Sequence, residues 1–227
     1  MQDKLEEMSA FFDARAEEYD VRHTGGIDAG EESKRILASF LPEGTRTLLD
    51  LGVGTGLELV EIFRRFPDIS VTGIDGAPKM LDKLRERFPE NNIRILCGDY
   101  LTAAFGSGCY DAVLTAMTLH HYTHAVKLAL YKRIYAALTD TGIYLENDYM
   151  LSASEFSDPQ REEERLFAEY EALKREQHLP DSAYYHFDTP CTVDNQIKLL
   201  LEAGFTRVEK VWGVKNNITL RAYKQGV

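Results

Sequence analysis

The chain has 227 residues, of which 44% are hydrophobic and 28% charged, a composition typical of one globular domain with a full core. Its 37 acidic and 26 basic residues give a net charge of −11, and so acidic a surface repels phosphate backbones and anionic lipid. We therefore expect neither nucleic acid nor membrane among its partners, and no apolar run approaches the roughly 20 residues of a membrane span.

The chain begins with "MQDKLEEMSAFFDARAEEYD", which is acidic and amphipathic, unlike a signal or transit peptide. Its cysteines, Cys97, Cys109 and Cys191, are scattered and lack the spacing of metal ligands. Both features predict a cytoplasmic protein with reduced thiols.

The first predicted element is an amphipathic helix. Its apolar residues recur at steps of three and four, namely Leu5, Met8, Phe12, Ala16 and Tyr19. We expect a loop at 23–30 and a second helix at 31–42, which Pro42 ends. Residues 1–40 would form an N-terminal helical cap.

Apolar strands and amphipathic helices then alternate. Strands are expected at 47–52, 69–75, 92–99, 110–116 and 142–148, and helices at 55–66, 77–88, 124–138 and 192–205. Short, nearly all-apolar strands that alternate with helices indicate a parallel sheet covered on both faces. Strands at 206–212 and 217–224, joined by the turn-like "GVKNN", complete the chain as an antiparallel hairpin at the sheet edge. The predicted fold class is α/β, with a doubly wound, Rossmann-like sheet of seven strands whose last strand is antiparallel.

Residues 152–189 interrupt this alternation. They carry a helix with one apolar stripe, made of Leu166, Phe167, Tyr170 and Leu173. The insert follows the fifth strand and so lies beyond the carboxyl ends of the strands, where doubly wound sheets bind ligands. A lid over the site and a surface helix that only packs both fit this pattern.

The segment "LLDLGVGTGL" interrupts a run of strand formers with Gly52, Gly54 and Gly56. A glycine-rich turn between a strand and a helix lets backbone N–H groups face a ligand. Dinucleotide-binding proteins place their third glycine one residue later, where Leu57 stands here, which argues against hydride transfer. The spacing D-x-G-x-G-x-G, from Asp50 to Gly56, resembles that of class I S-adenosylmethionine-dependent methyltransferases.

The resemblance continues from about residue 11 to the end of the chain. "FFDARAEEYD" is similar to the N-terminal helix of small-molecule members, "CGDY" to the end of their third strand, and "YDAVLTAMTLHHY" to their fourth strand and the turn after it. It implies that residues 1–227 are a single methyltransferase domain that binds S-adenosyl-L-methionine. The binding positions that it implies are Tyr19, Asp50, Gly52, Val53, Gly54, Gly56, Asp75, Gly76, Met80, Asp99, Tyr100, Ala116 and Met117.

The resemblance also implies what the polar residues among these do. Asp50 would bind the methionine ammonium group, and Asp75 would accept from both ribose hydroxyls. Asp99 would face the adenine amino group, with Tyr100 beside the ring, and Tyr19 would cap the cofactor. Capping of the helices that follow is the alternative for Asp50 and Asp75.

Methyl transfer from a sulfonium needs mainly orientation and exclusion of water, and a general base only where the acceptor loses a proton. His120, His121 and His186 are the candidate catalytic residues, because histidine titrates near neutral pH. Asp148 and Asp188 are further candidates. The alternative for the adjacent histidines is a hydrogen-bonded place in the wall of the site.

A metal site built from His120, His121 and His124 is not expected, because no carboxylate or thiolate lies nearby in the sequence to complete it. The expected function is methyl transfer from S-adenosyl-L-methionine to a small-molecule acceptor, by a monomer or a homodimer. A carboxy-S-adenosylmethionine synthase, which the N-terminal helix and the "TL" turn also resemble, is one alternative. It would need an arginine for its second substrate, and the insert offers Arg161, Arg165 and Arg175. A non-catalytic protein that binds the cofactor is the other.

Overall fold

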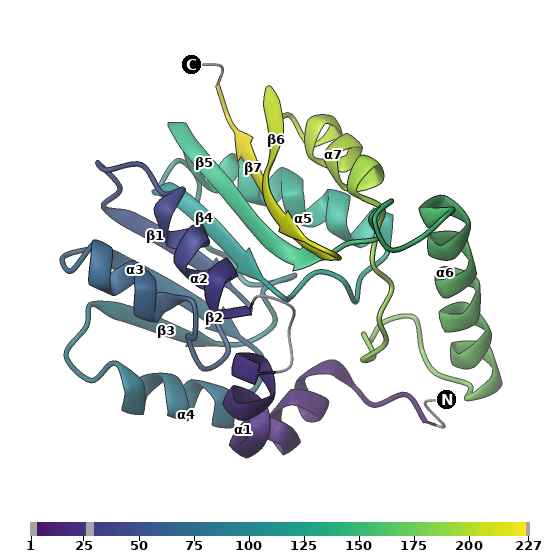
Figure 1. Cartoon of the computed structure of the whole chain (residues 1–227). Helices are drawn as coiled ribbons and strands as arrows, with labels where there is room; N and C mark the ends of the chain where they lie inside the picture. Colours follow the sequence, from purple (N-terminus) through teal and green to yellow (C-terminus); the bar gives the residue numbers. More distant parts are fainter. Residues whose placement is uncertain (1–3, 26–29, 226–227) are drawn as a thin grey trace.

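The computed structural model describes residues 4–25 and 30–225 (Figure 1). The helices within these ranges are α1 (Met8–Gly25), α2 (Gly30–Ser39), α3 (Leu59–Arg65), α4 (Pro78–Arg87), α5 (His124–Ala137), α6 (Pro159–Glu176) and α7 (Val193–Glu202). The strands are β1 (Thr47–Leu51), β2 (Ser70–Asp75), β3 (Ile93–Cys97), β4 (Tyr110–Ala116), β5 (Leu138–Tyr149), β6 (Arg207–Val214) and β7 (Asn217–Tyr223). No helix in the described ranges is long and apolar enough to cross a membrane.

These strands join one seven-stranded sheet in the order β3-β2-β1-β4-β5-β7-β6. Strands β1 to β5 are parallel to their neighbours in this group, and β7 is antiparallel to both β5 and β6. The order leads outward from β1 in both directions, as in doubly wound sheets with helical crossovers. The predicted α/β class and sheet are therefore confirmed.

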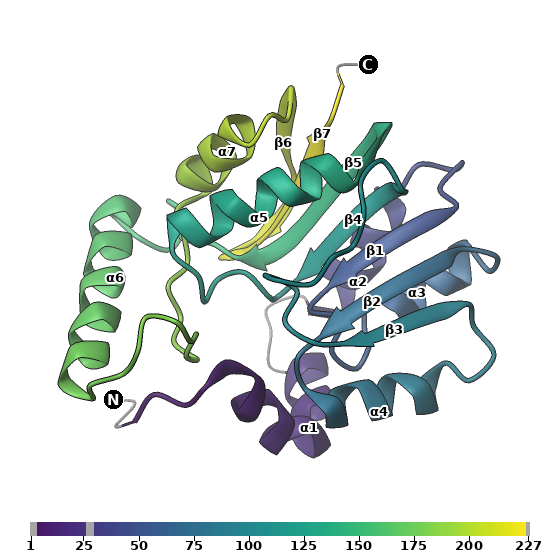
Figure 2. The same ribbon diagram turned by 180° about the vertical axis from the view of Figure 1, so that it is seen from behind.

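Helices cover both faces of the sheet and bury two apolar clusters (Figures 1 and 2). On one face α5 and α7 pack against the strands, with Ile134 fully buried. On the other face lie α2, α3 and α4, with Leu37 at their centre. Adjacent residues Leu48 and Leu49 of β1 belong to different clusters because successive strand residues point to opposite faces. This two-sided burial explains why the strands read as continuous apolar runs.

The helix after the glycine turn is shorter than predicted. It was expected at 55–66 but runs from Leu59 to Arg65. Gly54 and Gly56 have φ angles of +51° and +72°, which a right-handed helix does not accept. The turn therefore continues to residue 58 before the helix begins.

Other boundaries also differ from the prediction. The first helix begins at Met8 and leaves out Leu5, and the second ends at Ser39, before Pro42. The predicted loop at 23–30 lies partly within α1, which reaches Gly25, and residues 26–29 lie outside the described residues. Strand β5 begins at Leu138 rather than 142, because Leu138 pairs with Tyr110 of β4. The polar sequence "TDTG" at 139–142 has the composition of a turn, so the sequence did not predict that the strand extends through it.

The N-terminal segment and the end of the insert lie side by side. Met8 N donates to Tyr184 O at 3.0 Å, and His186 N donates to Glu6 O at 2.9 Å. We call residues 4–9 and 182–186 the cover. Together with α1, the cover lies beyond the carboxyl ends of the parallel strands (Figure 1).

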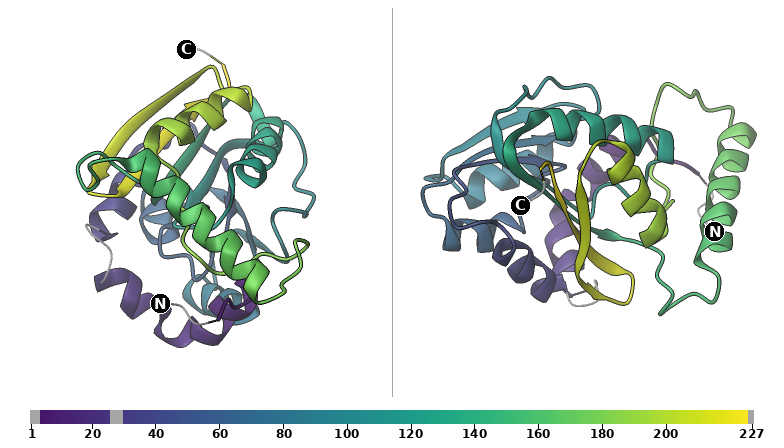
Figure 3. Two further views of the ribbon diagram at one scale, coloured as in Figure 1. Left: turned by 90° about the vertical axis from the view of Figure 1, so that its right-hand side faces the viewer. Right: turned by 90° about the horizontal axis from the view of Figure 1, so that it is seen from above.

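Helix α6 stands at one side of the molecule, away from the helices that cover the sheet (Figure 3). Its apolar stripe packs Tyr170 against Leu5, Tyr185 and Phe187, with Leu166 and Leu173 at the margin. These three stripe residues thus face the cover and Phe187, whereas Phe167, the fourth residue of the predicted stripe, packs against the apolar cluster of the sheet. Movement of this insert as a lid remains a prediction.

Candidate functional site

A cavity of ≈ 330 Å³ lies under the cover, at the ends of β1, β2, β3 and β4. The predicted cofactor-binding residues that line it are Tyr19, Gly52, Gly54, Asp75, Gly76, Met80, Asp99, Tyr100 and Met117. A smaller cavity of ≈ 40 Å³ adjoins it along the glycine turn. The predicted residues that line the smaller cavity are Tyr19, Gly52, Val53, Gly54, Gly56, Ala116 and Met117. The fold therefore gathers the predicted positions around two adjoining cavities, except for Asp50, which is buried behind the glycine turn and lines neither of them.

Two glycines of the turn stand where a larger residue does not fit. Gly52 has a φ of +76°, and a Cβ there would lie 2.4 Å from Thr118 Cγ2. A Cβ on Gly56 would lie 2.5 Å from Leu84 Cδ1 of α4. Gly52 thus lets the turn approach the segment after β4, and Gly56 lets it approach α4. Both contacts bring backbone close to the cavity wall.

Asp75 connects the glycine turn to the start of α4. Its Oδ2 accepts from Gly54 N at 2.9 Å, and its Oδ1 accepts from Ala77 N at 2.8 Å. Burial raises the pKa of Asp75, although these N–H groups act in the opposite direction. Each oxygen keeps a further lone pair for a hydroxyl group in the cavity. The carboxylate can therefore organise the turn and accept from a ligand at the same time.

Asp50 is fully buried, and neither of its carboxylate oxygens has a hydrogen-bond partner among the described residues. Burial, followed by the nearby Glu58 carboxylate, raises the pKa of Asp50 well above its usual range. Burial also raises the pKa of Glu58, which lines the smaller cavity. A buried acid pair of this kind is stabilised by a shared proton or by a cation. Asp50 lines neither cavity itself and lies next to Glu58, which lines the smaller one, so its charge favours a cationic group there.

Lys34 of α2 lines the smaller cavity as well. It is the one lysine or arginine that lines either cavity in the part of the chain described here. The smaller cavity thus offers a cation, Lys34, and an acid, Glu58, with the buried Asp50 carboxylate behind Glu58, and this combination suits a ligand group that carries both charges, such as an amino acid.

Asp99 and Tyr100 follow β3 at the opposite part of the large cavity. Asp99 is exposed, and its Oδ1 accepts from Leu101 N at 2.8 Å. Tyr100 is buried and donates from its hydroxyl group to the hydroxyl of Tyr122 at 2.9 Å. Tyr100 therefore presents a fixed ring in the wall, beside a carboxylate that retains free acceptor sites.

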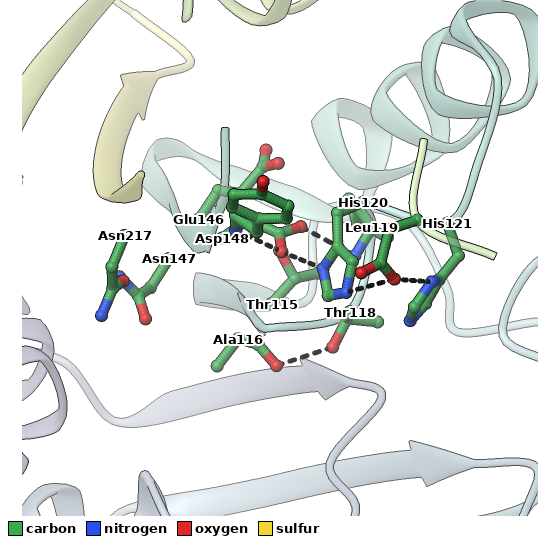
Figure 4. A network of polar contacts seen from close by, with 12 residues as sticks. Thr115, Ala116, Thr118, Leu119, His120, His121, Glu146, Asn147, Asp148 and Asn217 are labelled. Atoms are coloured by element: carbon green, nitrogen blue, oxygen red, sulfur yellow. Dashed lines mark hydrogen bonds and ion pairs between the residues drawn. The ribbon is translucent and has the colours of Figure 1, made fainter. Parts of the chain in front are cut away.

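His120 and Asp148 form a buried pair at the ends of β4 and β5 (Figure 4). His120 Nδ1 lies 2.5 Å from Asp148 Oδ1, and Asp148 Oδ2 accepts from Leu119 N at 2.8 Å. Burial lowers the pKa of His120, but the Asp148 carboxylate outweighs this effect and raises it. Because Asp148 occupies Nδ1, the atom of His120 that can exchange a proton with a ligand is Nε2.

His121 lines the large cavity, and His120 and His186 adjoin it without lining either cavity. The ring centroid of His121 lies 4.0 Å from that of His120 and 4.7 Å from that of His186. Burial and His120 lower the pKa of His121, and burial and His121 lower that of His186 to about 4. Both rings are therefore neutral near pH 7. The three candidate catalytic residues are gathered by the fold at one end of the cavity.

The histidines of "LHHYTH" do not form a single cluster. His120 and His121 share Asp188, whose Oδ1 lies 3.7 Å from His120 Nε2 and 3.3 Å from His121 Nδ1. His124 begins α5 and faces Glu163 and Cys191 instead. The sequence offered no carboxylate or thiolate close to these histidines, but distant segments bring Asp188 to His120 and His121, and Glu163 and Cys191 to His124.

Several cavity residues were missed from the sequence. They are Glu7, Met8, Ser9, Phe12, Ala77, Gly98, Thr118, Tyr122, Ser182, Ala183 and Tyr184 around the large cavity, and Gly30, Ser33, Lys34, Leu37, Thr55, Leu57, Glu58 and Asn147 around the smaller one. Glu58 had a local signal, since it is an acid directly after the glycine turn. The cover residues had none, because their position depends on pairing between the N-terminal segment and the end of the insert.

The arginines of the insert do not reach the site. Arg161, Arg165 and Arg175 lie on α6 and line neither cavity. Arg165 pairs with Glu162 and Glu169 on the surface of that helix.

Residues 48–142 match a family model described as a methyltransferase domain. An uncharacterised methyltransferase of Mycobacterium bovis is 37% identical over 86 residues, which are 38% of this chain and 43% of that protein. The chain therefore aligns with less than half of that relative's length. A carboxy-S-adenosyl-L-methionine synthase of Wolinella succinogenes is 28% identical over 205 residues, which are 86% of this chain and 82% of the relative.

Solved structures share the fold at lower identity. Human N-acetylserotonin methyltransferase, in complex with S-adenosylmethionine, is 19% identical with a TM-score of 0.63, over 95% of this chain and 55% of that one. Two other similar structures hold S-adenosylhomocysteine, the demethylated product. Likeness at this level establishes the arrangement of the strands and helices.

Proposed function

We propose that this chain, which carries a class I S-adenosylmethionine-dependent methyltransferase domain, transfers the methyl group of that cofactor to a small molecule. The observation that carries the proposal is the unpartnered, fully buried carboxylate of Asp50 beside the glycine turn. The ammonium group of a methionine moiety would supply the cation that this acid lacks. When bound, S-adenosylmethionine supplies an activated methyl group.

The chain offers partners for each part of the cofactor. Asp50 and Glu58 would bind its ammonium group, and Lys34 its carboxylate. Asp75 would accept from the ribose hydroxyls, with both of its oxygens already oriented by backbone N–H groups. Asp99 would accept from the adenine amino group.

The methyl acceptor would bind at the histidine end of the cavity. His121 lines the wall there, and burial keeps it neutral. His120 lies behind His121, so an acceptor that carries a proton would have to reach past His121 to pass it to Nε2 of His120, where Asp148 holds Nδ1 and would stabilise the resulting imidazolium. This Asp–His pair favours an enzyme over a protein that only binds the cofactor. The cover encloses this end and supports a small acceptor.

The alternative reaction of a carboxy-S-adenosylmethionine synthase is less consistent with the site. Its second substrate carries a carboxylate, but none of the described residues that line the large cavity is lysine or arginine. The charged or titratable groups on that wall other than tyrosine are the acids Glu7, Asp75 and Asp99 and the imidazole of His121.

Isothermal titration of the full chain with S-adenosylmethionine, S-adenosylhomocysteine and NAD tests the proposal. We expect roughly micromolar affinity for the first two, about −8 kcal/mol, and no heat from NAD. A screen of small metabolites with labelled methyl donor then identifies the acceptor. Saturable NAD binding without heat from S-adenosylmethionine would refute the proposal, and carboxyl transfer without methyl transfer would favour the synthase.

A further inference from the structure

A second group of polar side chains lies outside both cavities. His124 is the first residue of α5, Glu163 lies in α6, and Cys191 directly precedes Thr192, the N-cap of α7. Each offers one ligand atom, and these atoms lie within 4.8 Å of one another. Three segments that are distant in sequence therefore meet at a nitrogen, an oxygen and a sulfur.

The carboxylate of Glu163 is held in a fixed orientation. Its side chain is 1% exposed, and Oε1 contacts His124 Nε2. Oε2 accepts from Thr192 N at 2.6 Å and from Asn195 Nδ2 at 3.0 Å. One oxygen is thus oriented by the start of α7, while the other faces the histidine. Hydrogen bonds from an outer shell orient metal-binding carboxylates in the same way.

The sulfur of Cys191 has a cation beside it. Cys191 is fully buried, and Lys127 Nζ donates to its Sγ at 3.2 Å and to Gln196 Oε1 at 3.2 Å. Lys127 is itself buried, so water screens its charge poorly. The sulfur is thus held at a fixed position by a buried hydrogen bond, and cysteine is a common metal ligand through this atom.

We propose that His124, Glu163 and Cys191 bind a divalent metal ion of the zinc type. Imidazole nitrogen, carboxylate oxygen and thiolate sulfur are the ligands of zinc, at bond lengths of about 2.0–2.3 Å. Because the three atoms lie within 4.8 Å of one another, one ion can contact all of them after adjustment of the side chains. The His124 side chain is 41% exposed, so an ion can enter from its side and a water can complete four-coordination. The ion joins α6 to the starts of α5 and α7.

Titration of the full chain with Co²⁺, followed by absorption spectroscopy, tests this site. Tetrahedral cobalt bound to a thiolate gives an intense sulfur-to-cobalt charge-transfer band. We expect that band at one equivalent, with Zn²⁺ displacing the cobalt. The exposed thiols are removed first by Cys97→Ser and Cys109→Ser, and the band should persist in this background.

In the same background, Cys191→Ser should abolish the band, and His124→Gln should weaken Co²⁺ binding by at least about 100-fold. His124 is partly exposed, so its variant should fold even if loss of Cys191 proves disruptive, and unchanged binding of S-adenosylhomocysteine checks this. His120→Ala should leave the band intact, because the His120, His121 and Asp188 group contains no thiolate. Zn²⁺ should also slow hydrogen exchange across α6. A band that is absent from the background protein, or that survives His124→Gln at full affinity, overturns the proposal.

Discussion

Replacement of Asp50 by Asn should stabilise the free protein and weaken its binding of the cofactor. Asp50 is buried without a hydrogen-bond partner, beside Glu58. Because the pKa of Asp50 is raised on folding, the free energy of unfolding falls as pH rises from the pKa of Asp in the unfolded chain, near 3.9, through its pKa in the folded protein. The amide removes this cost, and its NH₂ group can donate to Glu58. We expect a gain of about 1–2 kcal/mol in the free energy of unfolding at pH 7.

The same change removes the charge that would hold the cofactor's ammonium group. A hydrogen bond to a charged group contributes about 1.5–3 kcal/mol, so affinity for S-adenosylmethionine should fall by roughly 10- to 150-fold. Urea denaturation measures the first effect and isothermal titration the second. Asp68→Asn, at an exposed position away from both cavities, is the matched control and should change neither. Unaltered affinity in Asp50→Asn would refute the cofactor assignment of this residue.

Asp75→Ala should weaken cofactor binding, measured by titration calorimetry, by roughly 2–3 kcal/mol. It should destabilise the fold by no more than about 2 kcal/mol, because the variant loses two backbone hydrogen bonds but no longer buries a charge. Intact affinity with lowered stability would mean that Asp75 only holds the backbone at the start of α4. Turnover should rise with pH through the pKa of His120, which lies above 6.5. Asp148→Asn should lower turnover about 10²-fold or more and move the inflection of the pH–rate profile to lower pH, without changing cofactor affinity. A flat pH–rate profile argues against a general base. As pH falls from 6.5 toward 4, the unfolded chain gains a proton on His186 that the folded protein does not, because the pKa of this residue is lowered on folding. The free energy of unfolding should therefore fall by about 1–2 kcal/mol, allowing for the partial exposure of His186. His186→Phe, measured by denaturation at each pH, should lack this contribution. Hydrogen exchange across 152–189 should slow when S-adenosylhomocysteine binds, whereas equal protection would indicate a static insert.

Most of the fold was predictable because its signals are local. The β1 strand, the glycine turn and the alternation of strands with helices each depend on residues close together in the sequence. The errors arose where tertiary pairing overrode composition. "TDTG" has the residues of a turn, yet Leu138 pairs with Tyr110 and draws this segment into β5.

The site was predictable mainly along the strand ends, together with Tyr19 of α1 and Met80 of α4. His120 and His121 follow β4 directly, so their place at the cavity end could be inferred. Asp188, by contrast, reaches them from the far end of the insert. His124 is only three residues after His121, but it starts a helix and therefore faces a different set of partners. Sequence spacing alone cannot separate these two groups.

The two backbone hydrogen bonds that join the halves of the cover have a kinetic consequence. Met8 pairs with Tyr184, and Glu6 with His186, so the two segments must separate before a molecule the size of the cofactor can pass between them. The cofactor would lie deepest and therefore enter first, with the acceptor following through the histidine end. The demethylated product would leave last. Such an enzyme follows a compulsory order of binding, is inhibited competitively by its own spent cofactor, and turns over no faster than the cover reopens.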